Sequence, residues 1–281
     1  MESFLRLEDI LSRTAFEFET VCRENTSYAY LGNNKALCRV LGKYKIYVDT
    51  RDIGITPHLV TDGFWETWLT QCISRIIKPG DICVDIGANY GYYSLLMSSL
   101  AGKEGRTIAV EPNPYVFGLL AATASVHSSN IEPVQVAVSD VTGYTTLVIP
   151  DNFFGDASIV ERKDKPRLGR SRVDVKTQTL DELAVQLELP RIDLVKIDVE
   201  GAEPQVFSGM KETISKNMDL RVLIEYSPYL YDDAKSFTEF LFQHFEVKRI
   251  KDVDNMITLT ETDIPALVSI KDHTDLYLAK K

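Results

Sequence analysis

The chain has 281 residues, enough for one large α/β domain or a smaller one with an N-terminal extension, and either would bury a substantial core. Its formal net charge of -10 argues against nucleic acid as a substrate, because phosphate binding needs a clustered excess of Lys and Arg. It shows neither a signal peptide nor an apolar run long enough to span a membrane, which predicts a cytoplasmic protein.

The N-terminal part differs in pattern from the rest of the chain. Residues 1–24 mix acidic residues with apolar ones at helical spacing, and two short β-like runs follow at 36–40 and 44–48. These runs belong to no repeating strand–helix unit. We therefore predict that residues 1–63 form a cap or lid on the remaining domain.

An amphipathic helix is predicted over residues 64–77, where apolar residues recur every three and four positions until Pro79-Gly80. Its first residues, including Trp65 and Glu66, would help a lid to exclude water. Trp65 and Trp68 are equally well explained as core anchors.

Strand-like and helical runs alternate from residue 81 onward. The predicted strands are 82–86, 107–110, 134–138, 194–199, 222–224, 245–250 and 275–278, and the predicted helices are 92–100, 115–125, 204–215 and 232–242. Strands that are apolar on both faces and joined by helices indicate a doubly wound, mostly parallel sheet within an α/β domain over 64–281. The last two strands lack a convincing helix between them, which suits an antiparallel hairpin at one edge.

One segment breaks this alternation. Residues 143–183 contain β-like pieces where a crossover helix would be expected, so we predict an inserted β-arm near the substrate side. The arm includes the densest basic stretch, 161–172, which also contains Pro, Gly and two acidic residues. It is read first as a solvated loop and second as a contact for an anionic substrate or partner.

Cysteine and histidine give no catalytic or metal-binding pattern. Cys22, Cys38, Cys72 and Cys83 form no C-x-x-C pair and are predicted to be buried free thiols in a reducing compartment. No histidine adjoins a predicted strand end, so these side chains are expected to be surface or packing residues; they are His58, His127, His244 and His273.

The first strand-to-helix turn is the predicted cofactor cradle, because ligands of open parallel sheets bind beyond the carboxyl ends of the strands. It runs from Asp85 through Gly87, Ala88, Asn89 and Gly91 to Tyr92. Glycines allow close backbone approach, and the N-terminus of the following helix suits a carboxylate such as that of a methionyl group. An acid at Asp85 favours a positively charged sulfonium over a pyrophosphate.

Acidic residues also follow the next two strands. Glu111, with Pro112 and Asn113, lies where the diol of a ribose would bind in such folds. Ser139 and Asp140 follow the third strand and are candidates to read an adenine amino group. Each acid has a plainer explanation as a helix cap or turn residue, but three at successive strand ends favour a nucleoside site.

The fourth strand carries charges in a position that should be central and buried. Lys196, Asp198 and Glu200 share one face at a period of two, and Glu225 ends the neighbouring strand. One carboxylate could act as a general base for a substrate hydroxyl, or Asp198 and Glu225 could hold a divalent cation such as Mg²⁺. The alternative is a Lys–carboxylate pair that only fixes local geometry.

Three stretches, 84–94, 110–114 and 194–203, resemble the FkbM-type methyltransferases in order and spacing, from residue 81 to about 228. The resemblance implies a seven-stranded, Rossmann-like class I methyltransferase fold. It also implies S-adenosylmethionine as cofactor and O-methylation of a sugar or secondary-metabolite hydroxyl, in a small molecule or glycan. By this resemblance Glu111 is the ribose ligand and residues 85–91 cradle the methionine.

Two other functions remain open from the sequence. A nicotinamide-dependent oxidoreductase would also use Glu111 on a ribose, although the first turn lacks G-x-G-x-x-G. A non-catalytic, cofactor-binding partner subunit would not need the charged face of Lys196, Asp198 and Glu200. The acceptor and the oligomeric state, including a homo-oligomer, are left open.

Overall fold

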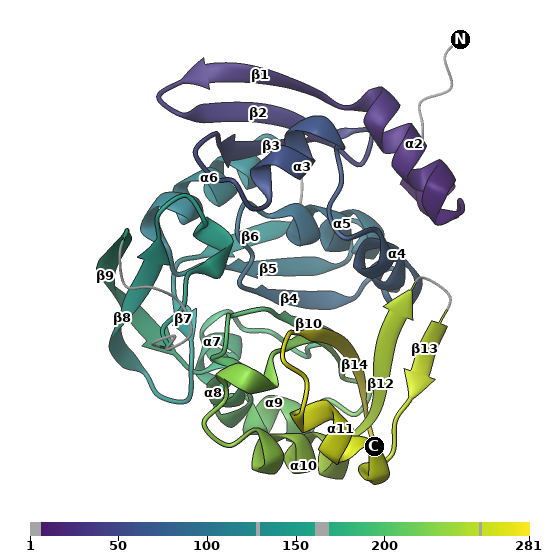
Figure 1. The fold of residues 1–281 in the computed structure, drawn as a ribbon, viewed down its shortest axis with the longest axis vertical. Coiled ribbons are helices and arrows are strands. Elements are labelled where there is room, and N and C mark those ends of the chain that lie inside the picture. Colours follow the sequence, from purple (N-terminus) through teal and green to yellow (C-terminus); the bar gives the residue numbers. More distant parts are fainter. Residues whose placement is uncertain (1–6, 128–129, 161–168, 253–254) are drawn as a thin grey trace.

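The computed structural model of the protein describes residues 7–127, 130–160, 169–252 and 255–281. A large central sheet runs through the molecule, with one three-stranded sheet at the N-terminal end and another in the inserted arm (Figure 1). Within the described part of the chain, no helix combines the length and apolar character needed to cross a membrane.

The central sheet has eight strands in the order β13-β12-β14-β11-β10-β4-β5-β6. Its strands are β4 (Ile82–Ile86), β5 (Arg106–Val110), β6 (Ile131–Val134), β10 (Leu194–Ile197), β11 (Arg221–Tyr226), β12 (Phe245–Asp252), β13 (Asn255–Thr258) and β14 (Thr274–Lys280). The five strands from β11 to β6 are parallel, and β14 is antiparallel to β11. The predicted doubly wound fold is confirmed, with eight strands in place of seven.

Helices cover both faces of this sheet. One face packs against α4 (Thr67–Ile76), α5 (Tyr92–Ala101) and α6 (Pro114–Ser125), and the other against α7 (Leu180–Gln186), α8 (Glu203–Ser208), α9 (Lys211–Lys216), α10 (Ala234–His244) and α11 (Ile264–Val268). On β10, Leu194 belongs to the first core while Val195 and Ile197 belong to the second. This alternation confirms the predicted period of two and places Lys196 on the α5 side.

The helices α6 and α7 each begin at a residue whose side chain caps the first turn. Asn113 accepts hydrogen bonds from the N–H groups of Tyr115 and Val116, and Pro114 follows it as the first residue of α6. Thr179 accepts from the Glu182 N–H at the start of α7. Both caps satisfy N–H groups that a helix cannot bond internally, so these residues fix where the helices begin.

The N-terminal segment contains α1 (Leu7–Leu11), α2 (Ala15–Asn25), β1 (Ser27–Gly32), β2 (Lys35–Val40), β3 (Tyr44–Asp49) and α3 (Thr56–Thr61). β1 was not predicted. Every residue of it except Gly32 is exposed, so it lacks the alternating pattern of a half-buried strand. The buried side chains of this segment join the core formed by α4, α5 and α6. All four cysteines are buried free thiols, as predicted.

The inserted arm forms its own sheet in the order β7-β9-β8, from β7 (Ala137–Val138), β8 (Gly143–Pro150) and β9 (Arg170–Gln178). A short 3-10 turn, η1 (Phe154–Asp156), lies between β8 and β9. The arm was predicted, but α7 shows that the expected absence of a crossover helix was wrong. Most of the basic stretch 161–172 lies outside the described residues, which resume at 169.

Three predicted elements differ in detail. The strand 134–138 splits into β6 and β7, which pair in different sheets. The helix 204–215 breaks at Gly209, where a Cβ atom would lie 2.1 Å from the Ser139 carbonyl oxygen. The last two predicted strands, β12 and β14, pair antiparallel as expected, but β13 and the short helix α11 separate them along the chain, and β13 forms the edge.

Candidate active site

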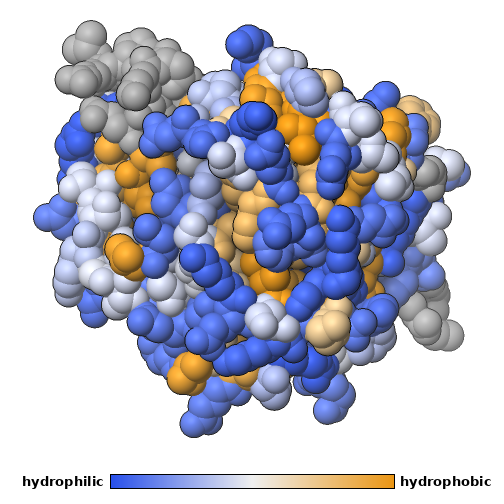
Figure 2. All heavy atoms as spheres, turned by 90° about the horizontal axis from the view of Figure 1, so that it is seen from below, coloured by the Kyte–Doolittle hydropathy of each residue, from blue (hydrophilic) through white to orange (hydrophobic). Residues whose placement is uncertain are grey.

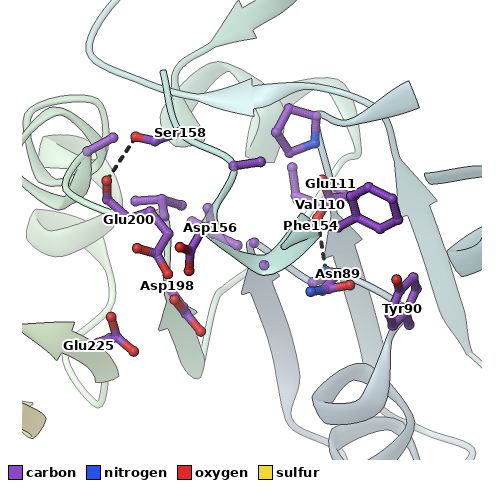
Figure 3. Close-up of a pocket in the computed structure, with 18 of the residues that line it drawn as sticks. Asn89, Tyr90, Val110, Glu111, Phe154, Asp156, Ser158, Asp198, Glu200 and Glu225 are labelled. Carbon is purple, nitrogen blue, oxygen red and sulfur yellow. Dashed lines mark hydrogen bonds between the residues drawn. The ribbon is translucent and has the colours of Figure 1, made fainter. Parts of the chain in front are cut away.

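A cavity of about 300 Å³ opens at the carboxyl ends of β4, β5, β10 and β11. The direction of winding changes between β4 and β10, so this is the position where open α/β sheets bind ligands. The loop after β4, the ends of the neighbouring strands and the inserted arm all contribute lining residues (Figure 3). Its volume is at the lower end of the range for small-molecule sites.

The cradle after β4 is held by its own backbone. The N–H groups of Gly87 and Ala88 both donate to the Val110 carbonyl oxygen at 3.0 Å. Gly87 has φ 81°, and a Cβ there would lie 1.8 Å from the Asp198 carbonyl oxygen. This glycine is therefore required by the approach of the β10 loop, a reason that differs from the predicted approach of a ligand.

Gly91 and Asn89 complete the turn. Gly91 has φ 93° at the start of α5, and a Cβ there would lie 2.6 Å from a methyl carbon of Leu120. Asn89 has φ 50°, a left-handed conformation that asparagine tolerates better than most residues. Its side-chain oxygen is buried without a hydrogen-bond donor, and Asn89 lines the cavity. An orphaned acceptor in this position fits a ligand that supplies the missing donor.

Glu111 lies across the cradle from Asn89 at the end of β5, with a side chain only 7% exposed. Its two carboxylate oxygens accept the N–H groups of Asn89 and Asn113, each at 2.9 Å. Burial raises the pKa of Glu111 to about 7, although both backbone N–H groups lower it. Each oxygen retains a lone pair for a second donor, as binding of a diol would require. Pro112 also lines the cavity, whereas Asn113 caps α6 and does not.

Lys196 lines the cavity and is the centre of a buried ion network. Its ammonium lies 3.0 Å from an Asp198 oxygen, 4.0 Å from an Asp85 oxygen and 4.9 Å from the centre of the Tyr93 ring. Burial lowers the pKa of Lys196, but Asp198 and Asp85 raise it by more, so the ammonium stays charged.

Asp85 does not line the cavity. It is fully buried, accepts a 2.6 Å hydrogen bond from the Ser94 hydroxyl, and presents its other oxygen to Lys196. Burial raises the pKa of Asp85, and the Lys196 ammonium offsets this only in part. Asp85, predicted as the first residue of the cofactor cradle, therefore faces Lys196 and not the cavity.

Asp198, Glu200 and Glu225 form an acidic cluster at the other end of the cavity (Figure 3). One oxygen from each lies within 4.8 Å of the others, the spacing that could hold a metal ion. Burial, and then the charge of Asp198, raise the pKa of Glu225 to about 10. The structure thus brings together Lys196 and all three carboxylates that the sequence singled out.

Glu203 fixes the turn that follows β10. Its buried carboxylate accepts the N–H groups of Val199 and Gly201, both at 3.1 Å. These bonds hold a sharp turn in which Glu200 has φ 55°, a left-handed conformation that is strained for a residue with a side chain. The sequence had given Glu203 no role.

Ser139 and Asp140 lie outside the cavity lining. Ser139 is buried against Gly209, and its hydroxyl donates to the exposed Asp140 at 3.0 Å. The change of sheet between β6 and β7 instead presents Val136, Ala137 and Val138 to the cavity. The predicted adenine-reading position is therefore apolar on its side-chain surface. Among the residues that line the cavity there is no histidine, as the sequence predicted.

Glu66 and Asp275 extend the acidic cluster, and neither was predicted as a site residue. Glu66 lines the cavity and accepts a 2.5 Å hydrogen bond from the Tyr93 hydroxyl. Burial, and then Asp275, raise the pKa of Glu66 to about 7. Trp68 donates its indole N–H to Asp275 at 2.8 Å, whereas Trp65 lines the cavity. Trp68 is exposed, whereas Trp65 is half-buried and packs against the core, so the core-anchor alternative fits Trp65 and not Trp68.

Comparison with known proteins gives consistent matches. A family model described as the methyltransferase FkbM domain matches residues 85–253. The chain is 28% identical over 175 residues to methyltransferase sdnD of Sordaria araneosa, covering 52% of this chain and 67% of that protein. It is 30% identical over 164 residues to 2-O-methyltransferase NoeI of Sinorhizobium fredii, covering 52% and 64%. It is 28% identical over 137 residues to hexuronic acid methyltransferase AglP of Haloferax volcanii, covering 49% and 53%. The matches span about half to two thirds of these relatives' own lengths.

Proposed function

The chain belongs to the FkbM methyltransferase family, and from that premise we propose that it is an S-adenosylmethionine-dependent O-methyltransferase. The observation that carries this proposal is one cavity with a diol-binding carboxylate, Glu111, at one end and the acidic cluster Asp198, Glu200 and Glu225 at the other. The family match and the charged acceptor end both favour methyl transfer over the activity of a nicotinamide-dependent oxidoreductase.

The cofactor would bind along the cradle. Glu111 would accept the ribose hydroxyls, and Asn89, whose buried side-chain oxygen has no donor, would meet a polar group of the cofactor. The N-terminus of α5, which begins at Tyr92, would face the methionyl carboxylate. When bound, S-adenosylmethionine supplies a methyl group already activated by its sulfonium charge.

The acidic cluster would prepare the acceptor. Glu225 carries a proton at neutral pH because its pKa is raised to about 10, whereas Asp198 is fixed by Lys196 at 3.0 Å. Asp198 is therefore our first choice as the general base for the acceptor hydroxyl, with Glu200 and Glu225 orienting that hydroxyl. Lys196 would hold Asp198 in place and remain charged itself. Alignment and exclusion of water would then be the main contributions of the protein.

The same cluster leaves a second route, in which Mg²⁺ bound by Asp198, Glu225 and Glu200 lowers the pKa of the acceptor hydroxyl. Removal of divalent cations with EDTA separates the two routes. If a carboxylate alone acts as the base, EDTA should leave the rate of methyl transfer unchanged. If a metal ion assists, EDTA should abolish activity and added Mg²⁺ should restore it.

We assign acceptor choice to the two segments outside the matched motifs, the cap (1–63) and the arm (143–183) of the methyltransferase domain (64–281). Both contribute to the cavity, with Gly54 and Ile55 from the cap and residues 153–159 from the arm. The proposed acceptor is a hydroxyl of a sugar or secondary metabolite. The small cavity supports that class, as do the names of two relatives, a 2-O-methyltransferase and a hexuronic acid methyltransferase.

Two measurements test the proposal. Calorimetry should detect S-adenosylhomocysteine binding and no NADH binding; the reverse result would assign the chain to the oxidoreductases. Formation of S-adenosylhomocysteine from S-adenosylmethionine should then be assayed over a panel of glycosides and polyketide alcohols. Asp198→Asn should retain binding and lose turnover, and binding without turnover of any acceptor by the natural chain would indicate a non-catalytic partner subunit.

A further inference from the structure

The inserted arm supplies one whole wall of the cavity. Residues 153–159 all line it, between the cap on one side and the β10 loop on the other. The arm is tied down at both ends, because the Ile53 N–H donates to the Asn152 carbonyl oxygen at 2.9 Å and the Ser158 hydroxyl donates to the Glu200 carbonyl oxygen at 2.8 Å. Between these ties, Gly155 lies beside Asn89, where a Cβ atom would be in ordinary contact, 3.5 Å from the Asn89 amide nitrogen.

Phe154 separates this cavity from a second, outer one. The outer cavity, of about 380 Å³, lies behind the arm and is lined by Arg51, Asn113, Tyr115 and other polar residues. Among the described residues, Phe154 is the one that lines both cavities. Its ring therefore forms the partition between them on the side of Glu111 (Figure 3). Movement of this ring would join the two spaces.

The ion pair of Arg51 and Asp49 holds the Phe154 ring in place. The Arg51 guanidinium lies 5.8 Å from the centre of the Phe154 ring and 5.4 Å from that of Tyr115, and the two rings pack edge to face at 6.0 Å. The Arg51 side chain donates three hydrogen bonds to Asp49, from Nε at 3.1 and 3.3 Å and from Nη2 at 2.8 Å. The Tyr115 hydroxyl donates to the same carboxylate. Asp49 is completely buried, so the surrounding packing holds its carboxylate, and with it Arg51, in position.

We propose that Phe154 closes the nucleoside end of the cofactor cavity and that Arg51 is the positioning residue that holds its ring there. The inference rests on the proposed function, because it concerns how long the S-adenosyl cofactor stays bound. An aromatic ring that covers the nucleoside excludes water and adds contact area. Release of the cofactor therefore requires the Phe154 ring to rotate toward the outer cavity. Arg51 stacks on that side of the ring and opposes this rotation.

Dissociation of S-adenosylhomocysteine, measured by stopped-flow fluorescence or surface plasmon resonance, tests this directly. Phe154→Ala should weaken binding by about tenfold or more, mainly through faster dissociation, as expected for loss of an aromatic contact with a base. Arg51→Ala should weaken it by about three- to fivefold in the same way. Because Arg51 acts through Phe154, the double variant should match Phe154→Ala within about twofold, a non-additivity that general loosening of the fold would not produce.

Arg23→Ala is the matched control. The Arg23 guanidinium also lies over a phenylalanine, Phe64 at 5.1 Å, and bonds an aspartate, Asp62 at 2.9 Å. Its side chain is 47% exposed, the same fraction as that of Arg51, but it does not line the cavity. Its loss should leave dissociation unchanged. Since Arg51→Ala leaves Asp49 without its cation, Arg51→Lys keeps the charge and removes the planar stack; it should also speed dissociation.

The outcomes separate the inference from the proposed function. If the natural chain binds S-adenosylhomocysteine but neither Arg51 variant changes the dissociation rate by twofold, or if the Arg51→Ala and Phe154→Ala effects multiply, the positioning role is overturned. If the natural chain does not bind S-adenosylhomocysteine at all, the proposed function fails, and the inference fails with it. Thermal unfolding of each unliganded variant confirms that the measured chain is folded.

Discussion

The two ends of the cavity hold their carboxylates in opposite ways. At the nucleoside end, Glu111 accepts one backbone N–H on each oxygen, from loops that are themselves fixed by the sheet. At the acceptor end, Asp198, Glu200 and Glu225 face one another, and Lys196 bonds Asp198. The first carboxylate is therefore held by backbone N–H groups, whereas the second set is held by charge. Burial and the neighbouring carboxylates raise the pKa of Glu225 to about 10, a perturbation typical of functional sites.

The face of the molecule drawn in Figure 2 is covered mostly by polar residues, which are interrupted by separate apolar patches. The two ends of the cavity lie in the interior, where low polarity strengthens electrostatic interactions relative to the surface.

The largest expected effect concerns the network that supports the acceptor end. Lys196→Met should lower the free energy of unfolding by about 3–5 kcal/mol, because it leaves buried Asp85 beside Asp198 without a cation. Urea denaturation measures the loss. Adding Asp85→Asn to Lys196→Met should recover much of it, and a double variant no more stable than the single one would show that Asp85 is not the group left uncompensated.

A smaller effect is expected at the nucleoside end. Glu111→Ala should weaken S-adenosylhomocysteine binding by about 2–3 kcal/mol, roughly 30- to 150-fold, since it removes a charged acceptor of ribose hydroxyls. Titration calorimetry gives the value. Glu132→Ala, which removes an exposed partner of Arg106 on the neighbouring strand, is the control and should bind normally. Equal losses in both variants would place the nucleoside elsewhere.

The pH dependence of stability should separate the two ends further. The pKa of Glu225 rises from 4.5 to about 10 on folding, so the folded state holds this proton more tightly than the unfolded state. Stability from this group is fully present below pH 4.5 and is lost as the pH rises toward 10, by at most about 1.4 kcal/mol per pH unit. Between pH 7 and 9, Glu225→Gln should unfold with a flatter pH profile than the natural chain. Identical slopes would contradict the raised pKa.

The smallest effect expected is that of a divalent cation on the acidic cluster. Mg²⁺ at about five times its dissociation constant should stabilise the natural chain by about 1 kcal/mol in thermal unfolding. The gain should be larger at pH 8.5 than at 6.5, because protons compete for the same carboxylates. Glu225→Gln should lose the gain. A gain that is absent or independent of pH would assign the cluster to proton transfer alone.

Local pattern was sufficient to predict several parts of this protein. The alternation of strands and helices, the turn at Gly87, the carboxylate at Glu111 and the shared face of Lys196 and Asp198 all follow from short-range periodicity and strand-end position. Parallel strands bring their carboxyl ends to one edge, so residues that follow successive strands meet there whatever the loops do. These predictions needed no knowledge of distant contacts.

Tertiary structure alone decided which residues complete the site. Asp140 follows a strand that changes sheet, so it turns away from the cavity, and Asp85 faces Lys196 because β10 lies beside β4. Phe154 reaches the cavity from the arm and Glu66 from the start of α4, and both positions depend on contacts with segments far along the chain. Periodicity within a segment cannot specify such placements, because they depend on the energy of packing between segments, which appears only once the chain has folded.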